Sequence, residues 1–401
     1  MIRRVFKAFQ YRDFRLMWMG ACASSIGTWM QEMAQSWLVL QLSNSPFLLG
    51  FNAFLSGLPI FLFSLVGGVV ADRIERRKVL LISQLVQMSC AFLLTLLIAT
   101  HLVQVWHILV CSFVAGLAQA FGGPAYQALI PSLVDKEDMP NAIALQSIQF
   151  NVARVIGPVV GGITMAQLGN VWCFALNGVS FLAPILSLLT LKARFYPAKT
   201  TESILHGMKQ GLSFIRCQSA MVSLMVLAFC MTALGIPMMT FLPVFAKDVF
   251  HQGPTIFTLF LSASGAGSIV GALTVAALGN VKHKGRIALI MLICLGAGIS
   301  GFAISTNLWL SCVTLFITGA SLISVFALVN SLVQLITTNE MRGRVMSVYN
   351  FAFRGGMPMG NLLTGWLVPL FTAPLVLAVN GLILMAVAVY FLTVQRRVAA
   401  L

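Results

Sequence analysis

Long apolar runs separated by short charged loops constrain the fold of this chain more than any other feature. Twelve such runs recur along its 401 residues, and about 20 apolar residues suffice for a helix to cross the hydrocarbon core of a bilayer. Only 9% of the residues are charged, against about 25% in an ordinary soluble domain. We therefore expect an all-α polytopic membrane protein with twelve transmembrane helices. The predicted spans are 15–41, 47–71, 79–100, 105–130, 141–166, 172–191, 219–246, 255–278, 287–304, 308–330, 344–368 and 374–394.

The distribution of lysine and arginine over the loops predicts the orientation of these helices. With a cytoplasmic N-terminus, the inner segments hold 22 of the 25 lysine and arginine residues, and the outer loops hold only Lys247. Basic residues stay on the cytoplasmic side during insertion, so both termini should be cytoplasmic. We expect a multi-pass protein of the plasma (inner) membrane. The formal charge of +15 then reflects topology and attraction to anionic membrane lipid, and it does not indicate nucleic-acid binding.

The second half of the chain repeats features of the first. Gly27, Pro46, Asp72 and Lys78 have counterparts 208 positions later in the same order, namely Gly235, Pro254, Asn280 and Arg286. Two such copies predict two pseudo-symmetric six-helix bundles, the architecture of transporters that rock one half against the other.

The longest stretch without a span divides these two bundles. We assign residues 1–191 to an N-terminal bundle, 192–218 to a cytoplasmic linker and 219–401 to a C-terminal bundle. Within the linker, apolar residues recur at helical spacing and predict an amphipathic helix on the inner membrane surface. These residues are Ile204, Met208, Leu212 and Ile215.

The loop after the second span carries the most specific motif, GGVVADRIERRKVLL at residues 67–81. So dense a charge cluster lies outside the hydrocarbon, where an acid can face a helix N-terminus and arginines can meet acids or lipid phosphates. The motif resembles motif A of the major facilitator superfamily, and the alternative is an ordinary basic inner loop. The resemblance implies a conformational latch on the cytoplasmic side. Its residues are Gly68, Asp72, Arg73, Arg76 and Arg77.

The fifth span contains RVIGPVVGG, which is similar to the antiporter motif C of exporters in the same superfamily. Its residues are Arg154, Gly157, Pro158, Gly161 and Gly162. Glycines allow close backbone approach, and proline removes a donor and bends the helix. The alternative is a plain helix-packing surface. Glycine pairs in the eighth and eleventh spans, Gly267 with Gly271 and Gly356 with Gly360, fall where the superfamily has contacts between its two halves, and we expect them to serve those contacts.

With further short motifs, the chain resembles the branch that contains the enterobactin exporter and the macrolide-efflux proteins. The resemblance implies the major facilitator fold and export by alternating access. The arginine that many drug:proton antiporters carry in the fourth span is missing, since that span offers only Ser112, Gln119 and Tyr126 as notable polar groups. The missing arginine argues against the standard form of drug:proton exchange.

Three ionisable residues fall inside the predicted spans. Apart from Arg15 and Arg344 at the first positions of their spans, Glu32 is the only acid, and Arg154 and Arg354 are the only bases. Each costs about 2.5–3.5 kcal/mol at mid-bilayer unless it has a partner, water or a function. Glu32 is our candidate proton carrier; a static ion pair with Arg154 and a water-exposed acid are the alternatives. Polar residues at helical spacing share one face of a helix, and we expect such faces to line a central transport cavity together with Glu32. The cavity candidates are Ser25, Thr28, Gln35, Gln119, Tyr126, Thr314, Thr318, Ser321 and Arg354.

These features predict a proton-coupled exporter of a small amphipathic molecule such as a siderophore or a macrolide-like drug. Two arginines against one glutamate favour neutral or anionic substrates. A transporter of lysolipid-like molecules is one alternative, and a membrane scaffold or membrane-embedded enzyme is another. We expect no enzyme activity, catalytic group, metal, cofactor or nucleotide site, because converging catalytic residues and phosphate loops are missing from the sequence. The proton gradient is the expected energy source, and a monomer the expected state.

Overall fold

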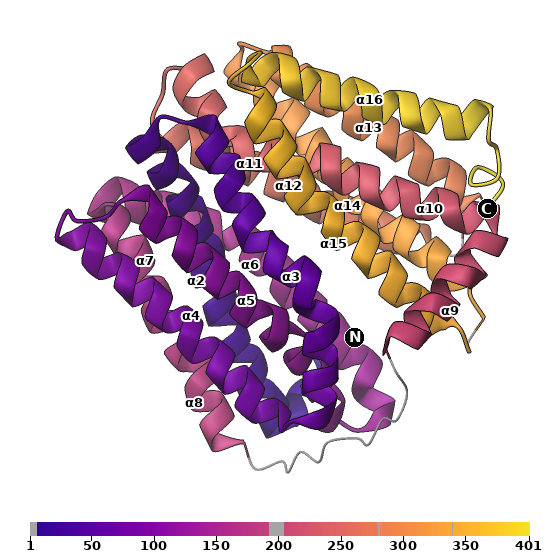
Figure 1. Ribbon diagram of the computed structural model, residues 1–401, viewed down its shortest axis with the longest axis horizontal. Coiled ribbons are helices and arrows are strands. Elements are labelled where there is room, and N and C mark those ends of the chain that lie inside the picture. The colour runs from indigo at the N-terminus through magenta and orange to yellow at the C-terminus, as the bar shows by residue number, and fades with distance from the viewer. Residues whose placement is uncertain (1–5, 192–203, 280, 282, 339) are drawn as a thin grey trace. The chain divides into compact units, whose positions relative to one another are not determined.

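The computed structural model describes residues 6–191, 204–279, 281, 283–338 and 340–401, without the side chains of residues 65, 69, 71, 72 and 204–209. Over these residues the regular secondary structure is entirely helical (Figure 1). The first five residues and residues 192–203 of the predicted linker lie outside the described part. The remainder of that linker forms a helix, as its apolar spacing predicts, from Ile204 to Cys217.

The helices before the linker follow the predicted spans closely. The sixth span is divided into two helices, α7 and α8, on either side of Phe181. The elements are η1 (Lys7–Gln10), α2 (Arg12–Ser43), α3 (Pro46–Arg73), α4 (Arg76–Ala99), α5 (Val105–Leu129), η2 (Ile130–Ser132), η3 (Lys136–Asp138), α6 (Met139–Leu168), α7 (Asn170–Ser180) and α8 (Leu182–Thr190).

The later helices contain two local changes of helix type. The seventh span consists of two α-helical segments with a π-helical turn between them, η4, and it ends in a second π-helical turn, η5. The elements are α9 (Ile204–Cys217), α10 (Ser219–Cys230), η4 (Met231–Gly235), α11 (Pro237–Val244), η5 (Phe245–Val249), α12 (Pro254–Leu278), α13 (Lys284–Ile304), α14 (Leu308–Ile336), α15 (Arg342–Leu367) and α16 (Ala373–Thr393).

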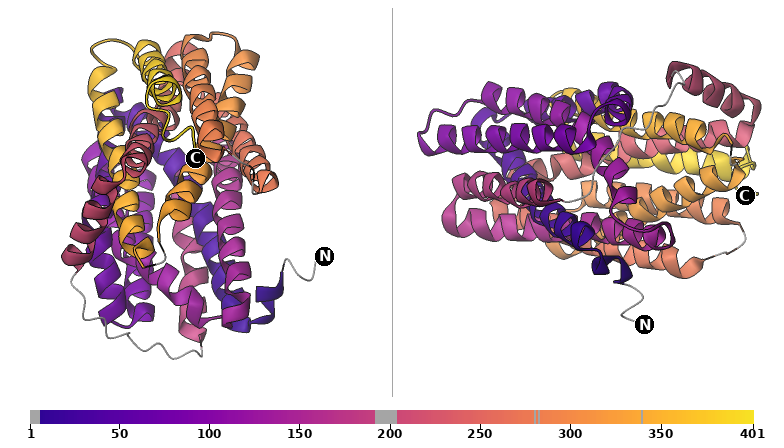
Figure 2. Two further views of the ribbon diagram at one scale, coloured as in Figure 1. Left: turned by 90° about the vertical axis from the view of Figure 1, so that its right-hand side faces the viewer. Right: turned by 90° about the horizontal axis from the view of Figure 1, so that it is seen from below.

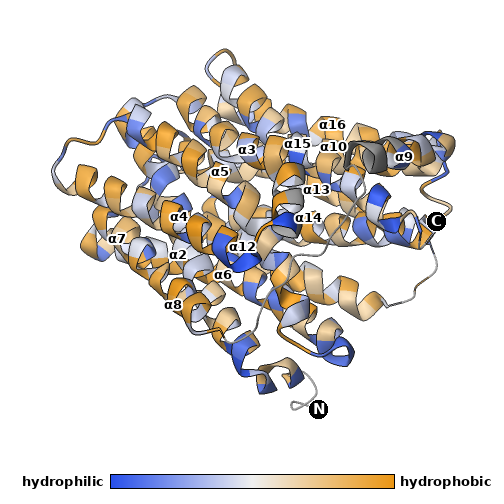
Figure 3. Ribbon diagram, turned by 60° about the horizontal axis from the view of Figure 1, so that its bottom comes forward, coloured by the Kyte–Doolittle hydropathy of each residue, from blue (hydrophilic) through white to orange (hydrophobic). Residues whose placement is uncertain are grey.

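Apolar residues dominate the helices, and hydrophilic residues gather near several helix ends and loops (Figure 3). Among the described residues, 10 helical segments are long and apolar enough to cross a membrane. The helices α2 and α15, predicted as the first and eleventh spans, are not among the 10. Both carry charged residues at their first positions and within their length, which lowers the hydropathy of any window that contains them.

The chain forms two compact units, and their division passes through α3. One unit consists of Met1–Ser43 with Leu58–Thr201, and the other of Asn44–Gly57 with Glu202–Leu401. Within the first unit α2 packs on α6 and α4 packs on α5. Within the second, α12 packs on α14, and α13 lies against α14 and α16 (Figure 1 and Figure 2).

The segment 44–57 is attached to the second unit by several contacts. Lys247 Nζ donates a 2.7 Å hydrogen bond to Asn44 Oδ1. The Gly50 backbone packs so closely on α15 that a Cβ there would lie 2.5 Å from the carbonyl oxygen of Asn361 and 2.9 Å from Cα of Gly365. Only glycine fits such an approach. The first three turns of α3 are therefore part of the second unit's packing.

Candidate transport site

A chain of polar side chains crosses the first unit between α2, α5 and α7. Asn177 Nδ2 donates to Gln31 Oε1 at 2.7 Å, and Gln31 Nε2 approaches Gln35 Oε1 at 3.5 Å. Gln35 Nε2 then donates to Ser112 Oγ at 2.8 Å. Buried polar groups require such partners because an unpaired donor or acceptor costs about 1–3 kcal/mol. These hydrogen bonds between side chains fix the rotation of α2 about its own axis at the level of residue 32.

Glu32 lies between these two glutamines and is exposed. Its backbone carbonyl accepts a 2.8 Å hydrogen bond from the Ser36 hydroxyl. Within the described ranges, no hydrogen bond or ion pair reaches the Glu32 carboxylate, and none joins it to Arg154. Arg154 is half-buried on α6 and has an interaction elsewhere. The static ion pair considered as an alternative for Glu32 is not formed.

The other polar residues on the predicted face of α2 have partners inside the first unit. Ser25 Oγ accepts a 2.7 Å hydrogen bond from Nε2 of Gln149 on α6, a side chain that also donates to the carbonyl of Ala21. Thr28 donates to the carbonyl of Ser24, one turn earlier, at 2.8 Å. These bonds tie the polar face of α2 to α6 on one side, as the amide chain ties it to α5 and α7 on another.

The remaining predicted cavity residues have different surroundings. Gln119 is exposed on α5 and accepts a 3.4 Å hydrogen bond from Gln87 on α4. Tyr126 packs on the hydrophobic cluster that includes Ala8, Phe14 and Leu129. Arg354 is exposed on α15, in the second unit. Gln119 and Tyr126 thus share the first unit with Glu32, and Arg354 belongs to the second unit.

The polar stripe predicted on α14 is largely a packing surface. Thr318 is fully buried and faces Gly298 of α13, and Ser321 is 3% exposed. Thr314 is half-buried and donates to carbonyls of its own helix. Hydroxyl groups that bond to the preceding turn can be buried without a further partner. This explains why their helical spacing did not mark a solvent-facing side.

The motif at residues 67–81, predicted as a loop, lies mostly in the last turns of α3 and the first turns of α4. Two of its arginines cap helices of the first unit. Arg76 donates to the carbonyl of Ala128 at 2.8 Å, and Arg77 donates to the carbonyl of Leu189 at 2.9 Å. Both acceptors lie in the last turn of a helix, where free carbonyls and the negative end of the helix dipole attract cations. Arg73 is exposed, and a Cβ on Gly68 would meet no atom within 4 Å. The side chain of Asp72 lies outside the described part.

The glycines of the α6 motif pack against α2. A Cβ at Gly157 would lie 2.5 Å from Cβ of Trp29 and 2.8 Å from the carbonyl oxygen of Ile26. A Cβ at Gly161 would lie 3.1–3.3 Å from atoms of Met30. Pro158 and Gly162 are buried in the same helix. These glycines therefore make a close contact inside the first unit, and the antiporter role of the motif stays a prediction.

The glycine pairs of α12 and α15 likewise pack inside the second unit. Gly267 and Gly271 face backbone carbonyls of α14, and Gly356 and Gly360 face the turn at residues 229–233. Their contacts described here are with neighbours in their own unit, and a role of these pairs in contacts between the halves stays a prediction. A glycine allows a neighbouring carbonyl to approach wherever two helices cross closely, and sequence spacing does not say which neighbour that is.

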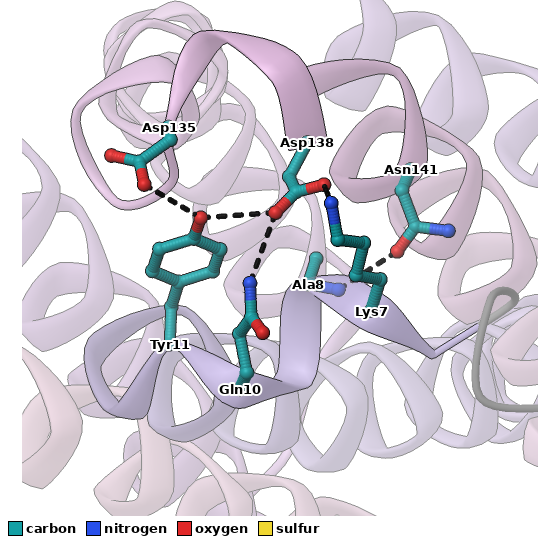
Figure 4. Close-up of polar contacts among 7 residues, drawn as sticks. All are labelled: Lys7, Ala8, Gln10, Tyr11, Asp135, Asp138 and Asn141. Atoms are coloured by element: carbon teal, nitrogen blue, oxygen red, sulfur yellow. Dashed lines mark hydrogen bonds and ion pairs between the residues drawn. The ribbon is translucent and has the colours of Figure 1, made fainter.

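A polar anchor that the sequence analysis missed joins the N-terminal turn η1 to the start of α6 (Figure 4). Asp138, 5% exposed, binds Lys7 Nζ at 2.7 Å and accepts hydrogen bonds from Gln10 Nε2 and the Tyr11 hydroxyl, both at 3.0 Å. The Tyr11 hydroxyl also contacts Asp135 at 2.9 Å. The Lys7 ammonium group holds the pKa of Asp138 below its ordinary value, and the carboxylate raises the pKa of Lys7. The sequence did contain a signal for a helix start at this place, an acid directly before a helix that begins with Met139-Pro140.

A membrane transporter has helices long and apolar enough to cross the membrane, as this chain does. It also needs polar side chains held in position among them, such as those on α2. The chain belongs to the transmembrane secretion effector family, which matches it over residues 4–400. The family lies within the major facilitator superfamily, so the membership expected from motif A is confirmed. The protein is a transporter and not an enzyme.

Individual relatives agree with this assignment. The multidrug efflux pump Tap of Mycolicibacterium fortuitum is 26% identical over 87% of this chain and 88% of its own length. The enterobactin exporter EntS of Shigella boydii serotype 4 (strain Sb227) is 26% identical over 95% of this chain and 91% of its own. The crystal structure of the nucleoside transporter NupG matches with a TM-score of 0.71 at 15% identity, over 95% of this chain and 98% of that one. This likeness confirms the major facilitator fold.

Proposed function

We propose that this protein exports small amphipathic molecules of the siderophore or macrolide class in exchange for protons, by alternating access. The observation that carries the proposal is the Glu32 carboxylate, which is exposed on α2 and has no ion pair among the described residues. It is the only acid in the predicted spans. An acid at that depth requires water or a function. The relatives Tap, a multidrug efflux pump, and EntS, an enterobactin exporter, support efflux.

In this proposal the two amides that flank Glu32 hold it in position. Asn177 and Ser112 fix Gln31 and Gln35, so the carboxylate can exchange a proton while α2 itself keeps its rotation. A carboxyl group in a poorly hydrated surrounding binds its proton more tightly, and an approaching cation or water weakens that binding. Protonation on one side of the membrane and release on the other would then drive export.

Transport by purified protein in proteoliposomes tests the coupling. We expect Glu32→Gln to abolish uphill efflux driven by a proton gradient while downhill exchange of labelled substrate continues. Glu137→Gln is the matched control, because it removes the same charge from an exposed position outside the predicted spans. Normal uphill efflux by Glu32→Gln would assign the coupling to another group or another ion. Absence of counterflow in the wild type would favour the scaffold alternative.

The substrate we propose is neutral or anionic and rich in oxygen acceptors. The interiors of the predicted spans hold two arginines against one glutamate, and Arg354 is exposed. Low dielectric strengthens the effect of this positive excess. We expect Arg354→Met to reduce efflux of an anionic siderophore more than efflux of a cationic dye, at equal expression. Faster efflux of cationic dyes than of any anion by the wild type would contradict this substrate class, and efflux of labelled lysolipid would support the alternative.

The motif at residues 67–81, across the junction of α3 and α4, is proposed to act as a latch in the transport cycle. Arg76 and Arg77 are already engaged with helix ends of the first unit, which would hold the loop rigid at the predicted cytoplasmic side. We expect Asp72→Asn to leave substrate affinity within a few-fold while it slows transport strongly. Full transport by this variant would refute the latch.

A further inference from the structure

The second unit contains a cavity of about 400 Å³ between the end of α14 and the beginning of α15. The α14 residues that line it recur at spacings of three and four, so they share one face of that helix. By the distribution of basic residues, this end of the unit is cytoplasmic. The lining residues are Ala327, Asn330, Ser331, Gln334, Leu335 and Arg342.

Hydrogen-bond donors dominate the polar lining. Gln334 Nε2 donates to Asn330 Oδ1 at 2.5 Å, which occupies the Asn330 acceptor and leaves Nδ2 as the donor of this amide, beside the Tyr349 hydroxyl. The Ser331 hydroxyl and the guanidinium of Arg342 add further donors. None of the six lining residues is acidic. Outside the lining, Glu340 and Arg344 lie two residues on either side of Arg342 and offset each other in charge.

The first turn of α15 adds further donors at the same place. The helix begins at Arg342, no side chain caps its N-terminus, and its first turn contains no acid. The first backbone N–H groups of a helix have no acceptor within the helix, and they form the positive end of its dipole. Anions are bound at such ends when a cavity gives access to them.

A buried hydroxyl group next to the cavity has no partner. Tyr349 lies seven residues after Arg342, and so on the same face of α15, with no exposed surface. Its hydroxyl is close to Asn330, a lining residue, but makes no hydrogen bond of acceptable geometry with any described group. Buried hydroxyl groups are nearly always hydrogen-bonded. A ligand oxygen in the cavity would supply the missing partner, directly or through Asn330.

We propose that this cavity binds an oxyanion, a phosphate or carboxylate group, through Arg342, Ser331 and the amide of Asn330. A planar guanidinium binds two oxygens of such a group at once. The oxyanion can belong to the headgroup of an anionic lipid of the cytoplasmic leaflet, or to a soluble molecule. The site is separate from Glu32 and does not depend on the proposed proton coupling.

The thermal stability of the full-length purified protein tests the site. Inorganic phosphate added in detergent is the soluble probe, and phosphatidylglycerol in nanodiscs of phosphatidylcholine is the lipid probe. A ligand that binds only the folded state raises the melting temperature with its concentration. A rise with phosphate indicates a soluble oxyanion, and a rise with phosphatidylglycerol alone indicates a lipid headgroup.

Two variants make the test specific. We expect Arg342→Gln to need at least ten times more probe than the wild type for the same rise in melting temperature. Arg397→Gln changes an exposed arginine outside the lining and should respond like the wild type. Tyr349→Phe should melt higher than the wild type without probe, because it removes an unpartnered buried hydroxyl, and should respond several-fold more weakly to the probe. A wild type that responds to neither probe, equal responses of the two arginine variants, or an unchanged response of Tyr349→Phe would overturn the proposal.

Discussion

A single methyl group at Gly157 should separate α2 from α6. The added Cβ would lie 2.5 Å from Cβ of Trp29, 2.8 Å from the carbonyl oxygen of Ile26 and 3.2 Å from the backbone nitrogen of Met30. Favourable carbon contacts lie at about 3.5–4.0 Å, so the two helices must move apart by about 1 Å. Two of the three atoms belong to the backbone of α2, and a change of rotamer cannot relieve them.

The expected cost follows from two opposing effects. Overpacking of this kind costs about 3 kcal/mol at the upper end of its range, where backbone is involved, and alanine is favoured over glycine in a helix by about 1 kcal/mol. We therefore expect Gly157→Ala to lower the free energy of unfolding by about 2 kcal/mol. Because α2 also carries Glu32, uphill efflux should decrease in the same variant.

Thermal melting of the detergent-purified protein measures this effect. The matched control is Gly123→Ala in α5, where the new Cβ would meet only Nε2 of Gln119 at 3.7 Å, an ordinary contact. We expect Gly123→Ala to melt with the wild type or slightly above it, and Gly157→Ala to melt several degrees lower. A Gly157→Ala protein as stable as the control would refute the close α2–α6 contact.

Three further predictions concern the first unit. Asp138→Asn should speed hydrogen exchange in residues 6–11, and Glu137→Gln should not. The folded pKa of Asp138 lies below its ordinary value of 3.8. The contacts of Asp138 with Lys7, Gln10 and Tyr11 should therefore hold above pH 3.8 and open as the pH falls through the lowered pKa. Equal exchange in both variants would contradict it. Arg76→Gln should destabilise the end of α5 by about 1 kcal/mol, seen as faster exchange in residues 126–129, while the exposed Arg73→Gln should leave it unchanged. Asn177→Leu should cost about 1–3 kcal/mol because it leaves the Oε1 acceptor of Gln31 without its donor. Adding Gln31→Leu should recover part of that loss in a double-mutant cycle, and strictly additive losses would refute the bond.

The helices of this protein could be predicted from hydropathy, and their interruptions could not. Each predicted span coincides with helix, since burial of apolar side chains in lipid determines both. The change of helix type at Met231–Gly235 and the division at Phe181 leave hydropathy unaltered, because they alter only which carbonyl each amide uses. The extension of α14 to Ile336, beyond the predicted 330, has a similar cause: polar residues end an apolar window without ending a helix.

The neighbours of the candidate site residues could be predicted only in part. Helical spacing placed Ser25, Thr28, Glu32 and Gln35 on one side of α2, but the same reasoning did not show that Thr318 faces Gly298. Spacing identifies a shared face and not the neighbour that covers it. The anchor at Asp138 joins residues more than 120 positions apart, and such pairs leave no periodic signal. Whether Glu32, Arg354 and Asp72 act in transport stays a prediction for the assays described above.

The packing of segment 44–57 has a consequence for how the protein can be divided. The chain before the linker supplies this piece of α3, yet its contacts with Lys247, Asn361 and Gly365 belong to the second unit. A fragment that starts at α9 would expose the backbone surface where Gly50 normally sits, and a fragment that ends at residue 191 would carry three helical turns without their own packing partner. Separately expressed halves should therefore be degraded when produced alone and become stable when coexpressed, as a split protein whose fragments complete each other. During synthesis, α3 likewise cannot complete its packing until the second half of the chain has been made.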